Sequence, residues 1–289
     1  MSHGNPSIPT SFRRARERDL HKISLPPECL KILQITDTHL YADTNSQLFG
    51  VNTLNSFRNT LSTFRCTGWQ PDLVLATGDL VHDASPDGYQ HLARLLDEFN
   101  CPVCCLPGNH DLPDVMLEHL RGRHVSCPQV VDHKGWRLVL LDSVLTGQVG
   151  GHLAESQLEL LDGGLREHGG PVLVSLHHQP VPVGSHWIDD LGLDNADALL
   201  ERVTTHPQVK GLLWGHVHQL FDKRLDGIRL LGTPSTCVQF TPSVDEFSVD
   251  QQQPGFRLLA LMPDGEILTE VLRTRHLPHG LEVTSAGYE

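Results

Sequence analysis

Residues 31–39 read KILQITDTH, an apolar run that ends just before the polar segment Asp37-Thr38-His39. The run at 31–35 has the length and composition of a strand buried on both faces. Four later apolar runs are also followed closely by polar residues. They occupy 72–76, 103–106, 172–176 and 211–214, and they precede Gly78-Asp79, Gly108-Asn109-His110-Asp111, His177-His178 and Gly215-His216-Val217-His218. Because ligands of open α/β sheets gather at the carboxyl ends of the strands, we expect all five polar segments to converge on one edge of a sheet.

The donor atoms of these segments are oxygen and nitrogen, with no thiolate among them. Such a set suits manganese, iron, zinc or magnesium better than a soft metal or a Cys-rich structural zinc site. Each segment alone is more often an ordinary loop or turn than a ligand. Five in this order indicate a catalytic site for two metal ions, with coordination positions open to water.

The whole chain is 289 residues long and carries a formal charge of −13. This length allows one large α/β domain, and the charge makes nucleic-acid binding through a basic face improbable. No apolar stretch approaches the roughly 20 residues that span a bilayer, and the polar, Arg-rich start has no apolar core behind it. We therefore expect a soluble, cytoplasmic protein without a membrane span; its oligomeric state is left open.

Seven cysteines include Cys101, Cys104 and Cys105 within one apolar run. The first two have the C-x-x-C spacing of redox motifs, but that motif normally opens a helix after a strand. Here the motif coincides with the strand itself. We therefore expect these cysteines to be reduced, buried thiols.

Helical spacing alternates with the apolar runs through the first half of the chain, which predicts consecutive βαβ units. Helices are expected at 52–64, 88–99, 113–120, 155–166 and 195–203. In the second half, strands at 136–142, 171–176, 211–214, 228–231, 256–262 and 266–272 come with short connections. The pattern favours an α/β fold with two mixed sheets packed face to face and helices outside, a four-layer α-β-β-α sandwich.

Three parts of the chain are expected to behave differently. Residues 1–29 form an N-terminal arm that is flexible or peripherally packed, 30–275 form a single domain, and 276–289 form a C-terminal tail. The arm contains the basic run Arg13, Arg14, Arg16 and Arg18. A membrane-surface or partner-binding role for this run is the sharper alternative.

The five polar segments resemble the pattern of the calcineurin-like metallophosphoesterase superfamily, which reads D-x-H, G-D, G-N-H-D or G-N-H-E, H, and G-H-x-H. The resemblance implies the metallophosphoesterase type of sandwich. It also implies that Asp37, His39 and His218 hold one metal, that Asn109, His177 and His216 hold the other, and that Asp79 bridges both. His177 and His178 are both possible ligands by position, and the resemblance favours His177. Two divalent or mixed-valence ions are expected, most readily iron, manganese or both, with zinc or magnesium as alternatives.

The same resemblance implies phosphoester hydrolysis by a hydroxide that bridges the two metals. His110 would be the general acid that protonates the leaving oxygen, and Asp111 would orient or charge its imidazole. Substrate would contact His39, Asp79, Asn109 and His110. His82 and Asp83 are candidates for outer contacts to the ligands.

Outside the ligands, the chain resembles the bacterial class III 3′,5′-cyclic AMP phosphodiesterases. The similarity is carried by 33–40, 49–53, 233–240 and 254–257, and extends weakly into 284–288. It implies hydrolysis of cyclic AMP to 5′-AMP, with this small molecule as the binding partner. The longer N-terminal arm is the main departure.

Two other functions remain open from the sequence. One is a broad phosphodiesterase or phosphomonoesterase that acts on 2′,3′-cyclic nucleotides or linear esters. The other is a catalytically silent nucleotide-binding regulatory protein. Trp187, Phe240, Ser235 and Thr236 are candidates for base, ribose or phosphate contacts, although each residue type is more often structural.

Overall fold

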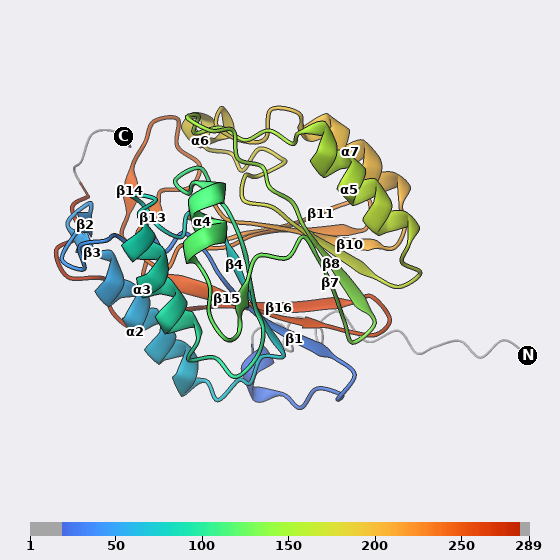
Figure 1. The fold of residues 1–289 in the computed structure, drawn as a ribbon, viewed down its shortest axis with the longest axis horizontal. Helices are drawn as coiled ribbons and strands as arrows, with labels where there is room; N and C mark the ends of the chain where they lie inside the picture. Colours follow the sequence, from blue (N-terminus) through green and yellow to red (C-terminus); the bar gives the residue numbers. More distant parts are fainter. Residues whose placement is uncertain (1–18, 284–289) are drawn as a thin grey trace, which may run out of the picture.

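Two packed sheets with helices on both outer faces make up the computed structural model, which describes residues 19–283 (Figure 1). Helices α2 and α3 lie on one side of the sheet pair, and α5 and α7 lie on the other (Figure 1). The predicted four-layer α-β-β-α sandwich is confirmed.

The first sheet has the order β16-β15-β1-β4-β5-β6. Its strands are β1 (Leu30–Ile35), β4 (Leu73–Thr77), β5 (Val103–Leu106), β6 (Val125–Ser126), β15 (Gly255–Leu261) and β16 (Ile267–Arg273). Strands β1, β4, β5 and β6 are parallel, whereas β15 runs antiparallel to both of its neighbours. The sheet is therefore mixed, as the sequence predicts.

The second sheet has the order β11-β12-β10-β9-β8-β7. Its strands are β7 (Val130–His133), β8 (Trp136–Leu140), β9 (Val172–Ser175), β10 (Val209–Trp214), β11 (Phe221–Leu225) and β12 (Ile228–Gly232). The four inner strands are parallel. The edge strands are antiparallel to their neighbours: β7 pairs with β8, and β11 pairs with β12.

The helices and short pairings complete the fold. They are η1 (Leu20–Lys22), α2 (Thr53–Cys66), α3 (Pro86–Leu96), α4 (Pro113–His119), α5 (Glu155–Arg166), α6 (His186–Asp189) and α7 (Ala196–Thr205), with β2 (Gln47–Leu48) paired to β3 (Val51–Asn52) and β13 (Gln239–Phe240) paired to β14 (Val249–Asp250). The predicted helices all form, with ends shifted by up to three residues. Among residues 19–283, no helix is long and apolar enough to cross a membrane.

Strand β1 shows how the apolar runs build the core. Leu30 and Ile32 face the second sheet, whereas Leu33 and Ile35 face the helices. A strand that is buried on both faces needs apolar residues at both parities, which is why its sequence is a continuous run. One core layer lies between the sheets and one lies under the helices on each side.

The topology corrects one expectation about the site. Strands β1, β4 and β5 belong to the first sheet, but β9 and β10 belong to the second. The five polar segments therefore come from the carboxyl ends of two facing sheets and not from one. A run of apolar residues predicts a strand but carries no information about which sheet the strand joins.

The end of the expected N-terminal arm packs against the domain. Leu20 is fully buried, and the His21 ring lies 2.8 Å from Glu270 on β16. At the other end, the Glu282 N–H donates to the carbonyl of Phe49. The basic run at 13–18 and the stretch at 284–288 lie outside the described residues.

Candidate metal centre

Five residues of the polar segments adopt a left-handed backbone that is uncommon outside glycine. Asp37, His39, Asp79, His216 and His218 have φ values of 51°, 46°, 51°, 64° and 48°. Such conformations persist only where the surrounding structure over-determines them, and they cluster at functional sites. Among the described residues, half of the ten non-glycine residues with a positive φ thus lie in these polar segments.

Glycines in three of the segments are required by close packing. A Cβ on Gly78 would overlap the ring of His177, one on Gly108 would overlap Asp79, and one on Gly215 would overlap Thr36. Gly78 also has a φ of 92°. The glycines let the loops of the two sheets approach each other closely enough to bring the polar side chains together.

Asp37, His39 and His218 form one half of the cluster. The two Nε2 atoms of His39 and His218 lie 3.2 Å apart, and Nε2 of His218 lies 3.5 Å from Oδ1 of Asp37. All three side chains are buried. Three donor atoms thus converge from the loop after β1 and from the loop after β10, across the two sheets.

His177 lies at the other half of the cluster. Its Nε2 is 3.3 Å from Oδ2 of Asp79 and 3.2 Å from Oδ1 of Asn109. The same Asp79 oxygen is 3.8 Å from Nε2 of His39. Asp79 therefore lies between the two halves.

Two buried donor atoms in the cluster test whether metal ions fit. Among the described residues, Oδ2 of Asp37 and Nε2 of His216 are buried and lack a hydrogen-bond partner. An unsatisfied buried carboxylate oxygen or imidazole nitrogen is costly, and cations satisfy both. The cluster fits metal ions, and its hard and borderline donors match the metals expected from the sequence.

Hydrogen bonds fix the tautomers of two imidazoles in the cluster. Nδ1 of His177 lies 2.9 Å from the carbonyl of Thr77, and Nδ1 of His218 lies 2.8 Å from the carbonyl of Val238. A carbonyl only accepts, so each Nδ1 carries the proton. In each ring Nε2 is therefore the nitrogen that faces the cluster, and it is the atom that can bind a metal once it carries no proton.

In the metal-free protein, burial and the neighbouring charges shift the pKa values of the cluster residues in opposite directions. Burial alone would raise the pKa of Asp79, but the imidazoles of His177, His110 and His39 hold that pKa well below its usual range. Burial lowers the pKa of His177, but the Asp79 carboxylate outweighs burial and raises the pKa to about 9. Burial holds the pKa values of His39 and His216 well below the usual range.

The two adjacent histidines on β9's exit loop differ in their surroundings. Both ring nitrogens of His178 have partners outside the predicted ligand set, at 2.8 Å from Oγ of Ser143 and 3.0 Å from the carbonyl of Val149. His177 instead directs Nε2 at Asp79. This contrast supports the choice of His177 over His178.

His110 lies beside the cluster with a half-buried side chain. Its backbone N–H donates to Oδ1 of Asp79 at 2.9 Å, and its ring meets the ring of His39 edge-on with centroids 5.0 Å apart. Asn109 and His110 thus lie at the accessible side of the cluster, where a substrate can reach them.

Asp111 occupies a different environment from the one expected. Its buried carboxylate accepts hydrogen bonds from three backbone N–H groups and from the hydroxyl of Tyr89 at 2.9 Å. The backbone donors are Leu80, Val81 and Gly108. Burial, followed by the charge of Asp79, raises the pKa of Asp111 to about 6. Asp111 therefore ties the loop after β5 to the loop after β4. That it orients or charges the imidazole of His110 stays a prediction.

Tyr89 is a residue that sequence reasoning missed. It lies on α3, is fully buried, and also accepts the N–H of Leu112 at 3.2 Å. A buried Tyr at helical spacing looks like any core residue, so no sequence signal separates it from its neighbours.

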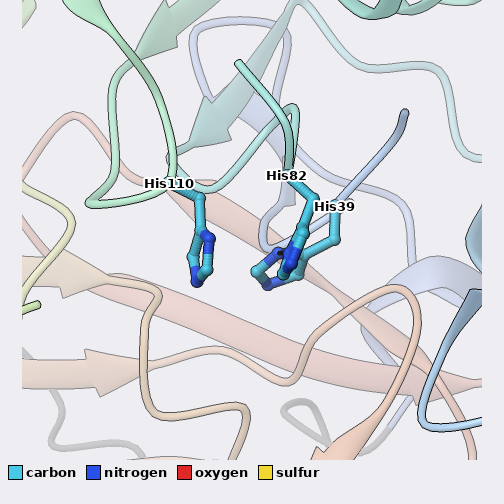
Figure 2. Close-up of side chains that lie close together, drawn as sticks. All are labelled: His39, His82 and His110. Carbon is cyan, nitrogen blue, oxygen red and sulfur yellow. Dashed lines mark hydrogen bonds between the residues drawn. The ribbon is translucent and has the colours of Figure 1, made fainter. Parts of the chain in front are cut away.

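His82 lies against both His39 and His110, and Asp83 points elsewhere. Figure 2 shows the three histidine rings side by side. Nδ1 of His82 is 3.0 Å from Nδ1 of His39, and its ring stacks on His110 with centroids 4.3 Å apart. The exposed Asp83 accepts hydrogen bonds from Ala42 and Ser85. The predicted outer contact is therefore seen for His82.

The candidates for base recognition are mostly inaccessible. Phe240 is buried and stacks on the ring of His218 with centroids 4.1 Å apart. Ser235 is buried and donates to the carbonyl of Asp37, and Thr236 is also buried. Only Trp187 is half-exposed. Phe240 and Ser235 thus contact residues of the cluster.

Comparisons with known proteins agree with this geometry. The profile of the calcineurin-like phosphoesterase family matches residues 30–220. The 3′,5′-cyclic adenosine monophosphate phosphodiesterase CpdA of Pseudomonas aeruginosa is 40% identical over 260 residues, or 89% of this chain and 94% of the relative. CpdA of Escherichia coli K12 is 42% identical over 264 residues, or 90% of this chain and 95% of the relative. A dimetal phosphatase from Danio rerio shares the fold, with a TM-score of 0.55 at 16% identity over 85% of this chain and 99% of its own.

Proposed function

The chain belongs to the calcineurin-like phosphoesterase family, and on that premise we propose that it is a metal-dependent phosphodiesterase that hydrolyses 3′,5′-cyclic AMP to 5′-AMP. One observation carries the substrate: two relatives named for this activity are 40% and 42% identical over about nine-tenths of the chain. The clustered donor set supports the reaction class.

Our proposed ligand assignment follows the halves of the cluster. Asp37, His39 and His218 hold one metal ion, and Asp79 bridges to the second. Asn109, His177 and His216 complete the second site. The close approach of the first three donors and the position of Asp79 between the halves support this division.

Two metal ions bound here would polarise the phosphoryl oxygens and lower the pKa of bound water. We propose iron or manganese, with zinc or magnesium as alternatives. Carboxylate, amide and imidazole donors admit all four metals. Metal analysis of the purified protein distinguishes them.

The reaction needs a proton donor at the leaving oxygen. As water attacks phosphorus and releases a proton to solvent, the P–O3′ bond breaks, and His110 gives its proton to the departing 3′-oxygen. Uptake of a proton from solvent restores His110 for the next turnover. The phosphate contacts His39, Asp79, Asn109 and His110, of which the last two are the most accessible. Asp111 supports the step indirectly, because it anchors the loop that carries Asn109 and His110.

We also propose a cytoplasmic location with a small nucleotide as the binding partner. All seven cysteines are unpaired, including Cys101 and Cys104, as is usual in a reducing compartment. Burial raises the pKa of Cys101 to about 11 and that of Cys104 to about 12, so both thiols are poor nucleophiles.

The test is a substrate panel with metal-loaded protein. We expect catalytic efficiency on cyclic AMP to exceed that on 2′,3′-cyclic AMP and on bis(p-nitrophenyl) phosphate. Comparable or greater efficiency on the latter two would favour a broad phosphodiesterase. Tight 5′-AMP binding with no turnover of any ester would favour a silent nucleotide-binding protein.

A further inference from the structure

His82 is a half-buried histidine that contacts both His39 in the cluster and the neighbouring His110. It comes from the loop after β4, three residues beyond Asp79. Figure 2 shows its ring close to those of both His39 and His110. One edge of the ring is 3.0 Å from Nδ1 of His39, and one face stacks on His110 at 4.3 Å between centroids.

We propose that His82 is a positioning residue with two separable roles: its Nδ1 accepts the hydrogen bond that fixes the tautomer of His39, and its ring face holds the imidazole of His110 in place. This inference rests on the proposed function, in which His39 is a ligand and His110 is the acid.

The tautomer argument starts at Nε2 of His39. This atom points into the cluster, 3.2 Å from Nε2 of His218 and 3.8 Å from Oδ2 of Asp79. A ligating nitrogen carries no proton, so the proton of neutral His39 is on Nδ1. Nδ1 of His82 must then accept it, which leaves the proton of His82 on Nε2.

His39 differs in this respect from two other ligand imidazoles. His177 and His218 donate Nδ1–H to the carbonyls of Thr77 and Val238, which no substitution removes. His39 is oriented by a side chain instead. Its ligand geometry can therefore be perturbed by a single substitution outside the ligand set.

The near-parallel rings exclude a third metal ion as an explanation of the cluster. The ring nitrogens of His39, His82 and His110 lie within 4.8 Å of one another, as three metal ligands would. However, a metal binds imidazole in the plane of the ring. The planes of His82 and His110 differ by only 20° and their centroids are 4.3 Å apart, so their lone pairs cannot converge on one ion.

The stack has a consequence for His110. One face of His110 is covered by His82, and the edge contact with His39 restricts it from a second side. The ring can turn only if these contacts break. A flat ring at position 82 therefore keeps the proton of His110 directed at one point beside the cluster.

Two substitutions separate the roles. His82→Phe keeps a flat ring and removes the acceptor, whereas His82→Gln keeps an acceptor and removes the ring. His279→Phe and His279→Gln are matched controls at an exposed position outside the cluster. Circular dichroism and thermal melts check that each variant folds.

The first measurement is Mn²⁺ affinity by competition with a chelator, which needs no turnover. We expect a roughly 10- to 100-fold loss for His82→Phe and a change of about threefold or less for His82→Gln. The second measurement, at saturating metal, compares kcat on cyclic AMP with kcat on bis(p-nitrophenyl) phosphate, whose leaving group departs without a proton. For His82→Gln we expect about a tenfold loss on cyclic AMP and less than a twofold loss on the aryl ester. His82→Phe should keep the wild-type ratio.

Parallel losses in both measurements for both variants, or no loss in either, would overturn the proposal. If the wild-type protein does not prefer cyclic AMP, the proposed substrate is wrong, and an alkyl diester then replaces cyclic AMP in the same comparison. If His82→Phe does not fold, the imidazole ¹⁵N chemical shifts of the zinc-loaded wild-type protein still show which nitrogen of His82 carries the proton. A proton on Nδ1 of His82 would contradict the proposal, and a proton on Nε2 supports it.

Discussion

Asp79 is the residue on which both halves of the cluster depend. One carboxylate oxygen lies 3.3 Å from His177 and 3.8 Å from His39, and the other accepts the N–H of His110. We expect Asp79→Ala to lose both metal ions, because it removes the bridge and an anchor of the neighbouring loop. Metal content after desalting measures this. Asp83→Ala, at an exposed carboxylate four residues away, should keep both ions, and retention of one full equivalent by Asp79→Ala would contradict the bridging role.

His110 is expected to act on turnover and not on metal binding. His110→Ala should lower kcat on cyclic AMP by roughly 10² to 10⁴, because the 3′-oxygen then departs without a proton. Steady-state kinetics beside metal analysis checks this prediction. Substantial loss of metal in this variant would show that His110 acts as a ligand instead of an acid.

The sequence motifs predicted which residues meet at the cluster, but they did not predict which contacts those residues make. Residue type and order were enough to bring Asp37, His177 and His218 under consideration. A motif gives the order of residues, however, and does not predict which way each side chain points. Asp111 follows His110 in sequence, yet its carboxylate turns to backbone N–H groups and Tyr89.

At the scale of elements, α2 offers a test of a helix start. Asn52 accepts the N–H of Asn55 at 2.9 Å, which caps the helix, and its amide donates to the carbonyl of Thr44. We expect Asn52→Ala to lower the free energy of unfolding by about 1 kcal/mol. Urea denaturation measures the loss. Asn59→Ala, at an exposed position within the same helix, should be neutral or slightly stabilising, and equal losses in the two variants would count against the cap.

In the two large sheets, the strands that the sequence did not predict are edge strands, namely β6, β7 and β11. Strand β11 reads FDKRL and is largely exposed, and β7 is nowhere fully buried. Each has one neighbour in the sheet and little apolar surface to cover. The inner strands were predictable because burial on both faces forces a continuous apolar run, whereas an edge strand needs no such pattern.

At the scale of the whole molecule, the cluster depends on how the two sheets meet. Asp37 and Asp79 follow strands of the first sheet, whereas His177 and His218 follow strands of the second. With the proposed ligands, metal binding bridges the two sheets, and unfolding separates these residues. The sequence predicts the strands, but only the packed sandwich shows that ligands far apart in the chain face each other.

Metal binding should also be coupled to pH through His177. Without metal, the Asp79 carboxylate outweighs burial and raises the pKa of His177 to about 9, above the ordinary value of about 6.5. The stability contributed by this bound proton is fully present below about pH 6.5 and is lost as the pH rises through about 9. A metal ion must displace the proton from Nε2, so metal affinity should rise with pH across the same window.

Thermal melts at pH 6.5, 7.5 and 8.5, with and without Mn²⁺, test this coupling. As the pH rises, we expect the Tm of the metal-free protein to fall and the gain in Tm on adding Mn²⁺ to grow. At a fixed concentration of free Mn²⁺, the free energy of unfolding rises with the logarithm of the metal affinity. Metal-free His177→Gln has no imidazole to hold the proton and should lose most of the fall in Tm. If the Tm of metal-free His177→Gln falls with pH as steeply as that of the wild type, the pH dependence comes from another group. If the gain in Tm on adding Mn²⁺ shrinks toward pH 8.5, Mn²⁺ does not displace a proton from the cluster.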